Sequence, residues 1–261
     1  MRIATWNINS VRLRAPLLDE LDALASPDVV CLQETKVVDE LFPHEVLEAR
    51  YPYRHARGMK GYNGVAILSK IPFTKTGGRD WCGRQDARHA TVTFKGGVEL
   101  HNFYVPAGGD VPDPAANDKF AHKLDFLAEL TDWLAAEAKP RARRILVGDL
   151  NIAPLEADVW SHKQLVNAVS HTPVEVEALG RVQAAHDWVD AVRHFAPDEQ
   201  LFSWWSYRSK DWRASNRGRR LDHVWVTPAL KGKLKGFEIL TDARDWPKAS
   251  DHVPVLIEIH V

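Results

Sequence analysis

The 261-residue sequence has few cysteines, no long hydrophobic run and no excess of charge of either sign. Its two cysteines are Cys31 and Cys82, and Cys31 lies within an apolar run. The sequence therefore predicts buried thiols in a reducing compartment rather than a disulfide-stabilised secreted scaffold. No apolar stretch approaches the length that spans a bilayer, so no membrane partner is expected. The first residues lack the apolar segment of a signal peptide, and we expect a cytoplasmic protein.

The overall charge does not indicate a nucleic-acid-binding protein, because 34 basic residues are balanced by 35 acidic ones. Binding to a polyanion would therefore require a local basic surface. The segment 204–220 has this composition, since aromatic and basic residues are interleaved in it and Asp211 is its only acid. This pattern favours a surface that contacts phosphates and stacks on bases. The DNA-binding candidates are Trp204, Trp205, Arg208, Lys210, Arg217, Arg219 and Arg220 in this segment, and His171 outside it.

Apolar runs bounded by turn residues recur along the chain and predict many strands separated by a few helices. The clearest helix is expected over 119–139, with Pro140 ending it, and a shorter one over 16–25. Residues 105–117 are predicted to form a functional loop, and 154–187 an irregular or short-helical stretch. Hairpin-like strands mixed with helices favour a layered α/β sandwich and a single domain over residues 1–261. Strands are expected at 2–7, 29–33, 65–69, 90–94, 98–104, 144–147, 221–226, 237–240 and 253–260.

Polar residues stand at the ends of five of these apolar runs. Side chains at the end of a buried strand usually line a site at the edge of the sheet. Carboxylate and amide oxygens near a histidine indicate a hard divalent cation that acts on a phosphate. The five segments are Asn7-Ile8-Asn9, Gln33-Glu34-Thr35, Gly148-Asp149-Leu150-Asn151, Arg220-Leu221-Asp222-His223 and Ser250-Asp251-His252.

Within these segments the residue types suggest distinct roles. Asp149 and Asn151 project together from an extended chain, so the carboxylate could deprotonate a water that the amide holds. His252 could act as a donor to phosphate oxygens, and Asp222 is the natural partner for its ring. Each residue alone could simply cap a turn, but five clusters together favour a site. Several ionised carboxylates in one place would also require a cation.

The chain resembles the exonuclease III and apurinic/apyrimidinic (AP) endonuclease family, within the larger endonuclease/exonuclease/phosphatase superfamily and closest in type to bacterial exodeoxyribonuclease III. The resemblance implies a four-layer α/β-β/α sandwich of two packed mixed sheets flanked by helices, as in DNase I, with the site at one edge. It extends over Trp6-Asn7-Ile8-Asn9, Leu32-Gln33-Glu34-Thr35-Lys36, Asn102-Phe103-Tyr104-Val105-Pro106, residues 148–154, 202–210, 216–222 and 250–255.

The resemblance also implies a role for each site residue. Glu34 would be the principal ligand of Mg²⁺, or of Mn²⁺ in its place, aided by Asn9 or Asp251. Tyr104 would contact the scissile phosphate, and Asp149 would activate the attacking water beside Asn151. Asp222 would orient His252, which would stabilise the developing charge. The full set of possible metal-site residues is Asn7, Asn9, Glu34, Asp149, Asn151 and Asp251.

The activity implied is that of a divalent-metal-dependent DNA repair nuclease that leaves 3′-hydroxyl ends. It would act as a 3′-to-5′ exodeoxyribonuclease, an AP endonuclease in base excision repair, or both, on double-stranded DNA and as a monomer. Two alternatives are a phosphoesterase of the same fold with a non-DNA substrate and a catalytically silent nucleic-acid-binding module. The complete acid set argues against the silent module, and the aromatic and basic segment argues for DNA.

Three residues depart from the family pattern and bear on substrate choice. Ala107 stands where an amide is common, and Arg219 where several members have an aromatic residue. His171 stands where AP endonucleases usually have an apolar residue, and it would narrow the pocket and favour 3′-terminal nucleotides over abasic sites. Trp204 and Trp205 would wall this pocket, although we expect one of the two to pack in the core.

Overall fold

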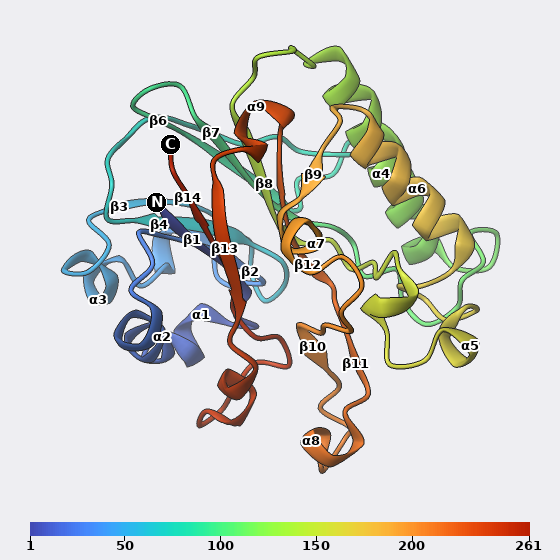
Figure 1. Cartoon of the computed structure of the whole chain (residues 1–261). Coiled ribbons are helices and arrows are strands. Elements are labelled where there is room, and N and C mark those ends of the chain that lie inside the picture. Colours follow the sequence, from blue (N-terminus) through green and yellow to red (C-terminus); the bar gives the residue numbers. More distant parts are fainter.

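Two six-stranded sheets lie face to face at the centre of the protein (Figure 1), in a computed structural model that describes all 261 residues. In the first sheet, β1 pairs parallel with β2 and antiparallel with β14, so the sheet is mixed. Its order is β13 (Leu234–Ile239), β14 (Val255–Ile259), β1 (Arg2–Asn7), β2 (Val29–Gln33), β4 (Val65–Ser69) and β3 (Tyr53–Arg57).

The second sheet is also mixed, because β7 pairs parallel with β8 while the other neighbours are antiparallel. Its order is β5 (Phe73–Gly77), β6 (His89–Phe94), β7 (Glu99–Tyr104), β8 (Arg144–Asp149), β12 (Asp222–Val226) and β9 (Val189–Asp190). A separate two-stranded ribbon pairs β10 (Trp204–Trp205) with β11 (Gly218–Arg219) and lies below the sheets in the view of Figure 1.

The alternation of side chains along the strands explains the four layers. In β2, Val29 and Cys31 point into the core between the sheets, whereas Val30 and Leu32 pack on the outer side against α2 (Leu17–Ala25). The outer side of the second sheet packs against α4 (Asp118–Ala136) and α6 (Pro173–Ala184). The predicted α/β-β/α sandwich of two mixed sheets is therefore confirmed.

The remaining helices are short and connect these layers. None of the helices in the structure is both long and apolar enough to cross a membrane. The short α-helices are α1 (Val11–Arg14), α3 (His44–Glu48), α5 (His162–Leu165), α7 (Ala191–Phe195), α8 (Trp212–Ser215) and α9 (Pro228–Lys231), and single 3₁₀ turns occur at Asp39–Leu41, Glu156–Asp158 and Thr241–Asp245.

Sequence analysis found the buried strands and missed the exposed ones. The predictions for β1, β2 and β4 agree with the observed bounds to the residue. Strands β3 and β5 were missed because they lie at sheet edges with partly exposed, mostly polar side chains. Helix α6 lies within a stretch expected to be irregular or short-helical, although Thr172, Pro173 and Glu175 form a regular helix start with a capping box.

Gly148 lets β8 approach β7 closely just before the polar residues that end β8. Its φ is +141°, and a Cβ atom at this position would lie 1.9 Å from the carbonyl oxygen of Phe103. We therefore expect Gly148→Ala to lower the free energy of unfolding by about 1–3 kcal/mol through overpacking, and by about as much again through backbone strain. Chemical denaturation measures this loss.

Gly180→Ala is the matched control for this substitution. Gly180 lies exposed in α6, and nothing is within 4 Å of the position that its Cβ would occupy. Alanine there should stabilise the protein by roughly 0.5–1 kcal/mol, because glycine is the poorer helix former. Equal effects of the two substitutions would contradict the role given to Gly148.

Candidate active site

The predicted polar strand ends meet at one edge of the two sheets. Asp149 ends β8 directly opposite Asp222, which begins β12. Beyond the strand ends the chain turns sharply, because Asn9, Glu34 and Asn151 have positive φ angles of 48°, 52° and 54°. Such backbone conformations are costly for these residue types and concentrate at functional sites. They turn successive side chains from separate strands towards the same edge.

Glu34 is held by three donors from different parts of the chain. Its Oε1 accepts hydrogen bonds from Nδ2 of Asn7 and from the hydroxyl of Tyr104, both at 2.8 Å, and its Oε2 lies 2.8 Å from Nζ of Lys36. Burial alone would raise the pKa of Glu34, but the hydrogen bonds from Asn7 and Lys36 outweigh it and the pKa is lowered. Glu34 is therefore ionised at neutral pH.

The oxygens beside Glu34 are arranged to hold a cation. The ammonium of Lys36 bridges Oε2 of Glu34 and Oδ1 of Asn9, the latter at 2.6 Å. Asp251 lies next to them, because its Oδ1 accepts from Nδ2 of Asn9 at 3.2 Å. Carboxylate and amide oxygens are the ligands that Mg²⁺ and Mn²⁺ prefer, so this set fits either ion. Sequence analysis gave Lys36 no role, although it lies in the quoted motif.

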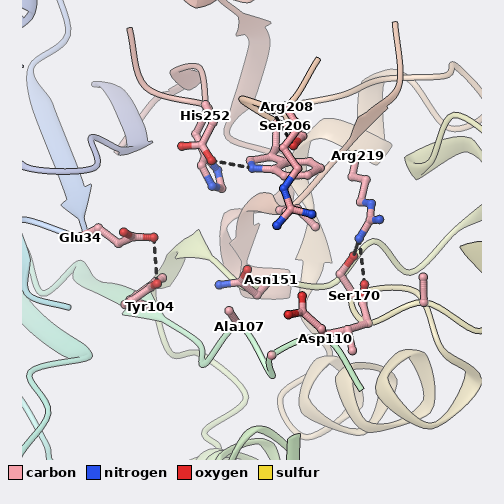
Figure 2. A pocket seen from close by; sticks show the side chains of 16 residues that line it. Glu34, Tyr104, Ala107, Asp110, Asn151, Ser170, Ser206, Arg208, Arg219 and His252 are labelled. Carbon is pink, nitrogen blue, oxygen red and sulfur yellow. Dashed lines mark hydrogen bonds between the residues drawn. The ribbon is translucent and has the colours of Figure 1, made fainter. Parts of the chain in front are cut away.

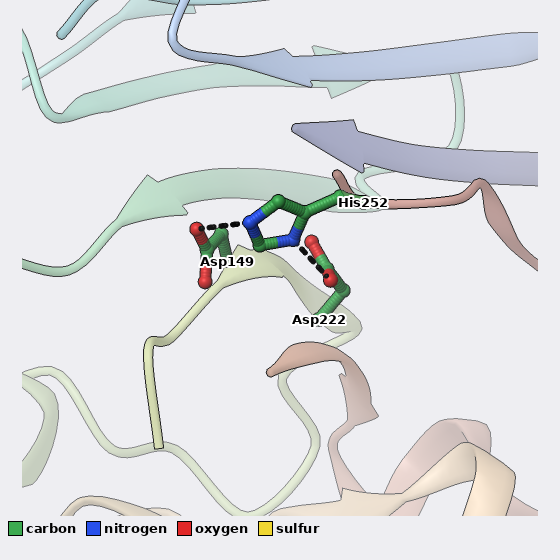
Figure 3. Close-up of side chains that lie close together, drawn as sticks. All are labelled: Asp149, Asp222 and His252. Atoms are coloured by element: carbon green, nitrogen blue, oxygen red, sulfur yellow. Dashed lines mark hydrogen bonds and ion pairs between the residues drawn. The ribbon is translucent and has the colours of Figure 1, made fainter. Parts of the chain in front are cut away.

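Asp149, Asp222 and His252 form a buried cluster (Figure 3). Nδ1 of His252 lies 2.8 Å from Oδ2 of Asp222, and Nε2 lies 3.7 Å from Oδ2 of Asp149. Burial would lower the pKa of His252, but the two carboxylates outweigh it and raise the pKa above its usual value. The pKa of Asp149 is raised mainly by burial, against the charge of His252. The longer contact leaves Nε2 free to donate to a substrate oxygen.

Amide and hydroxyl groups fix both carboxylates of this cluster. Oδ2 of Asp149 accepts from Nδ2 of Asn7 at 2.9 Å and from Nδ2 of Asn151 at 3.2 Å. Oδ2 of Asp222 accepts from the hydroxyl of Ser203 at 2.7 Å. Asn7 thus bridges Glu34 and Asp149, which supports the site without adding charge. The structure brings together every residue predicted for catalysis or metal binding.

A cavity of about 590 Å³ opens beside this cluster (Figure 2). One end is formed by the polar strand ends, including Glu34, Asn151 and His252, and the opposite end by Ser170 and Arg219. A second cavity of about 420 Å³ is lined by Arg208 and Arg217 and shares Ser206 and Arg208 with the first. Arg208 and Arg217 make the far part of the two joined cavities a basic groove, which leads from the carboxylates of the polar cluster.

Several residues predicted to bind DNA lie along this groove. Trp204 and Arg208 line the first cavity. Arg217 is exposed and its guanidinium lies 4.7 Å from the ring centre of Trp160. Lys210 is exposed and forms no ion pair. These positions leave their charges available to phosphates.

Three predicted DNA-binding residues are buried instead, and the prediction for them is wrong. Arg220 is fully buried and forms ion pairs with Asp158 at 2.5 Å and with Asp190 at 2.9 Å. Trp205 is buried, and its Nε1 donates to Asn216, so it is the tryptophan of the pair that packs in the core, as expected.

His171 is the third buried residue. Its Nδ1 lies 2.6 Å from the carbonyl oxygen of Ala153 and its Nε2 lies 2.8 Å from Nδ1 of His162. The imidazole therefore does not narrow the cavity, whose wall at this place is formed by Val169 and Ser170. Ala107 does line the cavity.

Sequence analysis missed a buried ion pair beneath the cavity. Nζ of Lys123 lies 2.5 Å from Glu175, with both side chains completely buried. Lys123 also donates to the carbonyl oxygens of Ala107 and Asn151, and Glu175 accepts from the backbone N–H of Ser170. The pair therefore fixes three segments that line the cavity. The available signal was the position of Lys123, three residues after Phe120 and four before Leu127, on the apolar face of its helix.

Comparison with known proteins identifies the family. The model of the endonuclease/exonuclease/phosphatase family matches residues 4–252. Exodeoxyribonuclease III of Haemophilus influenzae is 32% identical over 273 aligned residues, which cover 99% of this chain and 99% of that protein. The exodeoxyribonuclease of Bacillus subtilis is 29% identical over the full length of both proteins.

Solved structures agree with this assignment over the whole chain. An AP endonuclease from Archaeoglobus fulgidus superposes with a TM-score of 0.93 at 29% identity, and all of both chains is covered. The 3′ phosphatase NExo from Neisseria, bound to a product DNA hairpin, superposes with a TM-score of 0.90, also at 29% identity and with full coverage of both. This chain belongs to the endonuclease/exonuclease/phosphatase family, in the branch that contains exodeoxyribonuclease III and the AP endonucleases.

Proposed function

We propose that this protein is a divalent-metal-dependent DNA repair nuclease that hydrolyses phosphodiesters of double-stranded DNA and leaves 3′-hydroxyl ends. Its substrates would be abasic sites, 3′ termini or both, and it would act in the cytoplasm as a single-domain monomer. The observation that carries the proposal is the pairing of His252 with Asp222 beside the buried Asp149, at the mouth of a basic groove.

The geometry of the cluster supports a specific division of labour. Asp149 would accept the proton of the attacking water, because its raised pKa makes it a stronger base than an exposed carboxylate. His252 would donate from Nε2 to a phosphate oxygen, with Asp222 holding the ring and stabilising its positive charge. Burial and the nearby Glu34 raise the pKa of Tyr104, so its hydroxyl stays protonated as a donor.

The metal would complete the charge balance of this site. Glu34, with Asn9 or Asp251, would hold Mg²⁺ or Mn²⁺, with Asn7, Asp149 and Asn151 close by. When bound, the ion would neutralise charge on the phosphate that reacts. The ammonium of Lys36 lies between the side-chain oxygens of Glu34 and Asn9, so it would have to move for the metal to bind there.

The first test compares two labelled duplexes, one with an internal abasic site and one with a recessed 3′ end, in Mg²⁺ and in EDTA. We expect cleavage of at least one duplex, and a loss of about a thousandfold in rate without metal, because such an ion contributes several kcal/mol of charge stabilisation. Incision at the abasic site would identify an AP endonuclease, and laddering from the 3′ end an exonuclease. Cleavage of a soluble phosphoester alone would favour the phosphoesterase alternative, and metal-independent cleavage would contradict the proposed metal site.

A further inference from the structure

Arg219 lies deep in the cavity and is held there by neutral groups. Its Nη1 donates to the carbonyl oxygen of Val169 at 2.8 Å and to Oγ of Ser170 at 2.6 Å. Its guanidinium lies over the ring of Trp204, its cross-strand partner in the β10–β11 ribbon, at 5.4 Å from the ring centre. Three contacts therefore fix the orientation of this side chain before any ligand binds.

Arg219 forms no ion pair, and the carboxylate that acts on its pKa from nearby, Glu175, is already paired with Lys123. Its neighbour Arg220 is paired with Asp158 and Asp190, whereas no carboxylate lies within ion-pair distance of Arg219. Asp110 lines the same cavity but is exposed and forms no ion pair with it. Burial accordingly lowers the pKa of Arg219, although the guanidinium stays charged.

Two of the donor groups of Arg219 are also unused. Nε is buried without a hydrogen-bond partner. Nη2 forms no hydrogen bond in the protein and is not among the buried unpaired atoms, so it is accessible from the cavity. A partly buried cation with free donors is costly, and an anionic group of a ligand would satisfy both its charge and its hydrogen bonds.

The position of Arg219 shows which part of a substrate it would meet. Trp204 lies between Arg219 and His252, because it pairs with Arg219 on one side and forms a bridge with His252 on the other. Two strand spacings place the backbones of Arg219 and His252 roughly 10 Å apart. Figure 2 shows Arg219 across the cavity from Glu34. A phosphate at the catalytic cluster would thus direct the group attached to it towards Arg219.

We infer that Arg219 is a specificity-determining residue that receives negative charge on the fragment that leaves with the phosphate. The inference rests on the proposed nuclease function. It assigns to the cavity a preference for a 3′-phosphoglycolate, whose carboxylate is attached to the reacting phosphate, over a neutral abasic sugar. With an apolar or aromatic side chain at this position, the cavity would instead prefer the neutral abasic sugar.

The experiment measures kcat/KM on four duplexes that differ only in the damaged position. They carry a 3′-phosphate, a 3′-phosphoglycolate, a 3′-hydroxyl and an internal tetrahydrofuran as a neutral abasic sugar. Arg219→Met should reduce the ratio of kcat/KM on the phosphoglycolate to kcat/KM on the other three duplexes by about 10- to 100-fold, the value of a charge-assisted hydrogen bond. Arg219→Lys should restore part of the ratio. The 3′-phosphate carries no group beyond the reacting phosphate, so a loss on it as large as the loss on the phosphoglycolate would contradict the inference.

Two controls separate specificity from general DNA binding and from misfolding. Arg217 lies outside the first cavity, so Arg217→Met should lower kcat/KM on all four substrates by the same factor. Thermal unfolding tests whether Arg219→Met is folded, and binding of phosphoglycolate-ended and hydroxyl-ended duplexes in EDTA gives the same ratio without turnover. An unchanged ratio, or an equal loss on all four substrates, would overturn the inference. If the wild-type protein cleaves none of them, the proposed function fails instead.

Discussion

Asp149→Asn is expected to reduce turnover by about 10²- to 10⁴-fold while leaving DNA binding in place. The substitution removes the buried base that faces Nε2 of His252 across 3.7 Å. Asparagine has nearly the same shape, and its single side-chain oxygen can keep the hydrogen bond from Nδ2 of Asn7 or the one from the backbone N–H of Asn151. Arg208 and Arg217 form no hydrogen bond or ion pair with Asp149, so they continue to bind phosphates.

The measurement is single-turnover cleavage of a labelled duplex in Mg²⁺, with affinity determined in EDTA on the same duplex. Asp198→Asn is the matched control, because Asp198 is exposed and forms no ion pair, and it should behave as the wild type. Turnover of Asp149→Asn within tenfold of the control would show that another group activates the water.

Arg220→Met should destabilise the fold by about 3–5 kcal/mol, without the uniform loss of DNA affinity expected of a phosphate contact. The substitution removes the counter-ion of Asp158 and Asp190, so part of their buried negative charge is no longer neutralised. Arg193 still pairs with Asp158 at 2.5 Å, so some compensation is retained. Chemical denaturation at pH 7 measures the loss.

The pH dependence gives this prediction a second check. Burial alone would raise the pKa of Asp158 and of Asp190, but the charge of Arg220 outweighs it, and both pKa values are lowered. In the wild type the two carboxylates therefore contribute stability above about pH 4, the ordinary pKa of aspartate, and this stability is lost as the pH falls further. In Arg220→Met, burial should raise the pKa values of Asp158 and Asp190. Their protonation as the pH falls would then remove part of the destabilisation. The difference in free energy of unfolding between the wild type and Arg220→Met should therefore be smaller at pH 4 than at pH 7.

Arg217→Met is the contrasting control for Arg220→Met. Arg217 is exposed, and its loss should leave stability nearly unchanged while flattening the salt dependence of DNA binding by about one phosphate contact. If Arg220→Met instead flattens the salt dependence of DNA binding and leaves the free energy of unfolding unchanged, Arg220 contacts DNA after all.

The sequence alone determined the buried strands and the composition of the site. Continuous apolar runs such as Val29–Gln33 are typical of strands buried on both faces, and a polar residue that follows such a run emerges at a sheet edge. For this reason the order of residue types along the chain is enough to group Glu34 with Asp149. Strands without a buried face, such as β3, carry no such pattern and were missed.

Only the tertiary structure decided which neighbouring residues of the aromatic and basic segment face the groove. Arg219 and Arg220 are adjacent in the sequence, and so are Trp204 and Trp205, and each pair contributes one residue to the cavity and one to the interior. Side chains alternate sides in an extended chain, so composition cannot tell the two members apart. The difference depends on residues distant in the sequence, since Asp158 and Asp190 form ion pairs with Arg220 while no carboxylate forms an ion pair with Arg219.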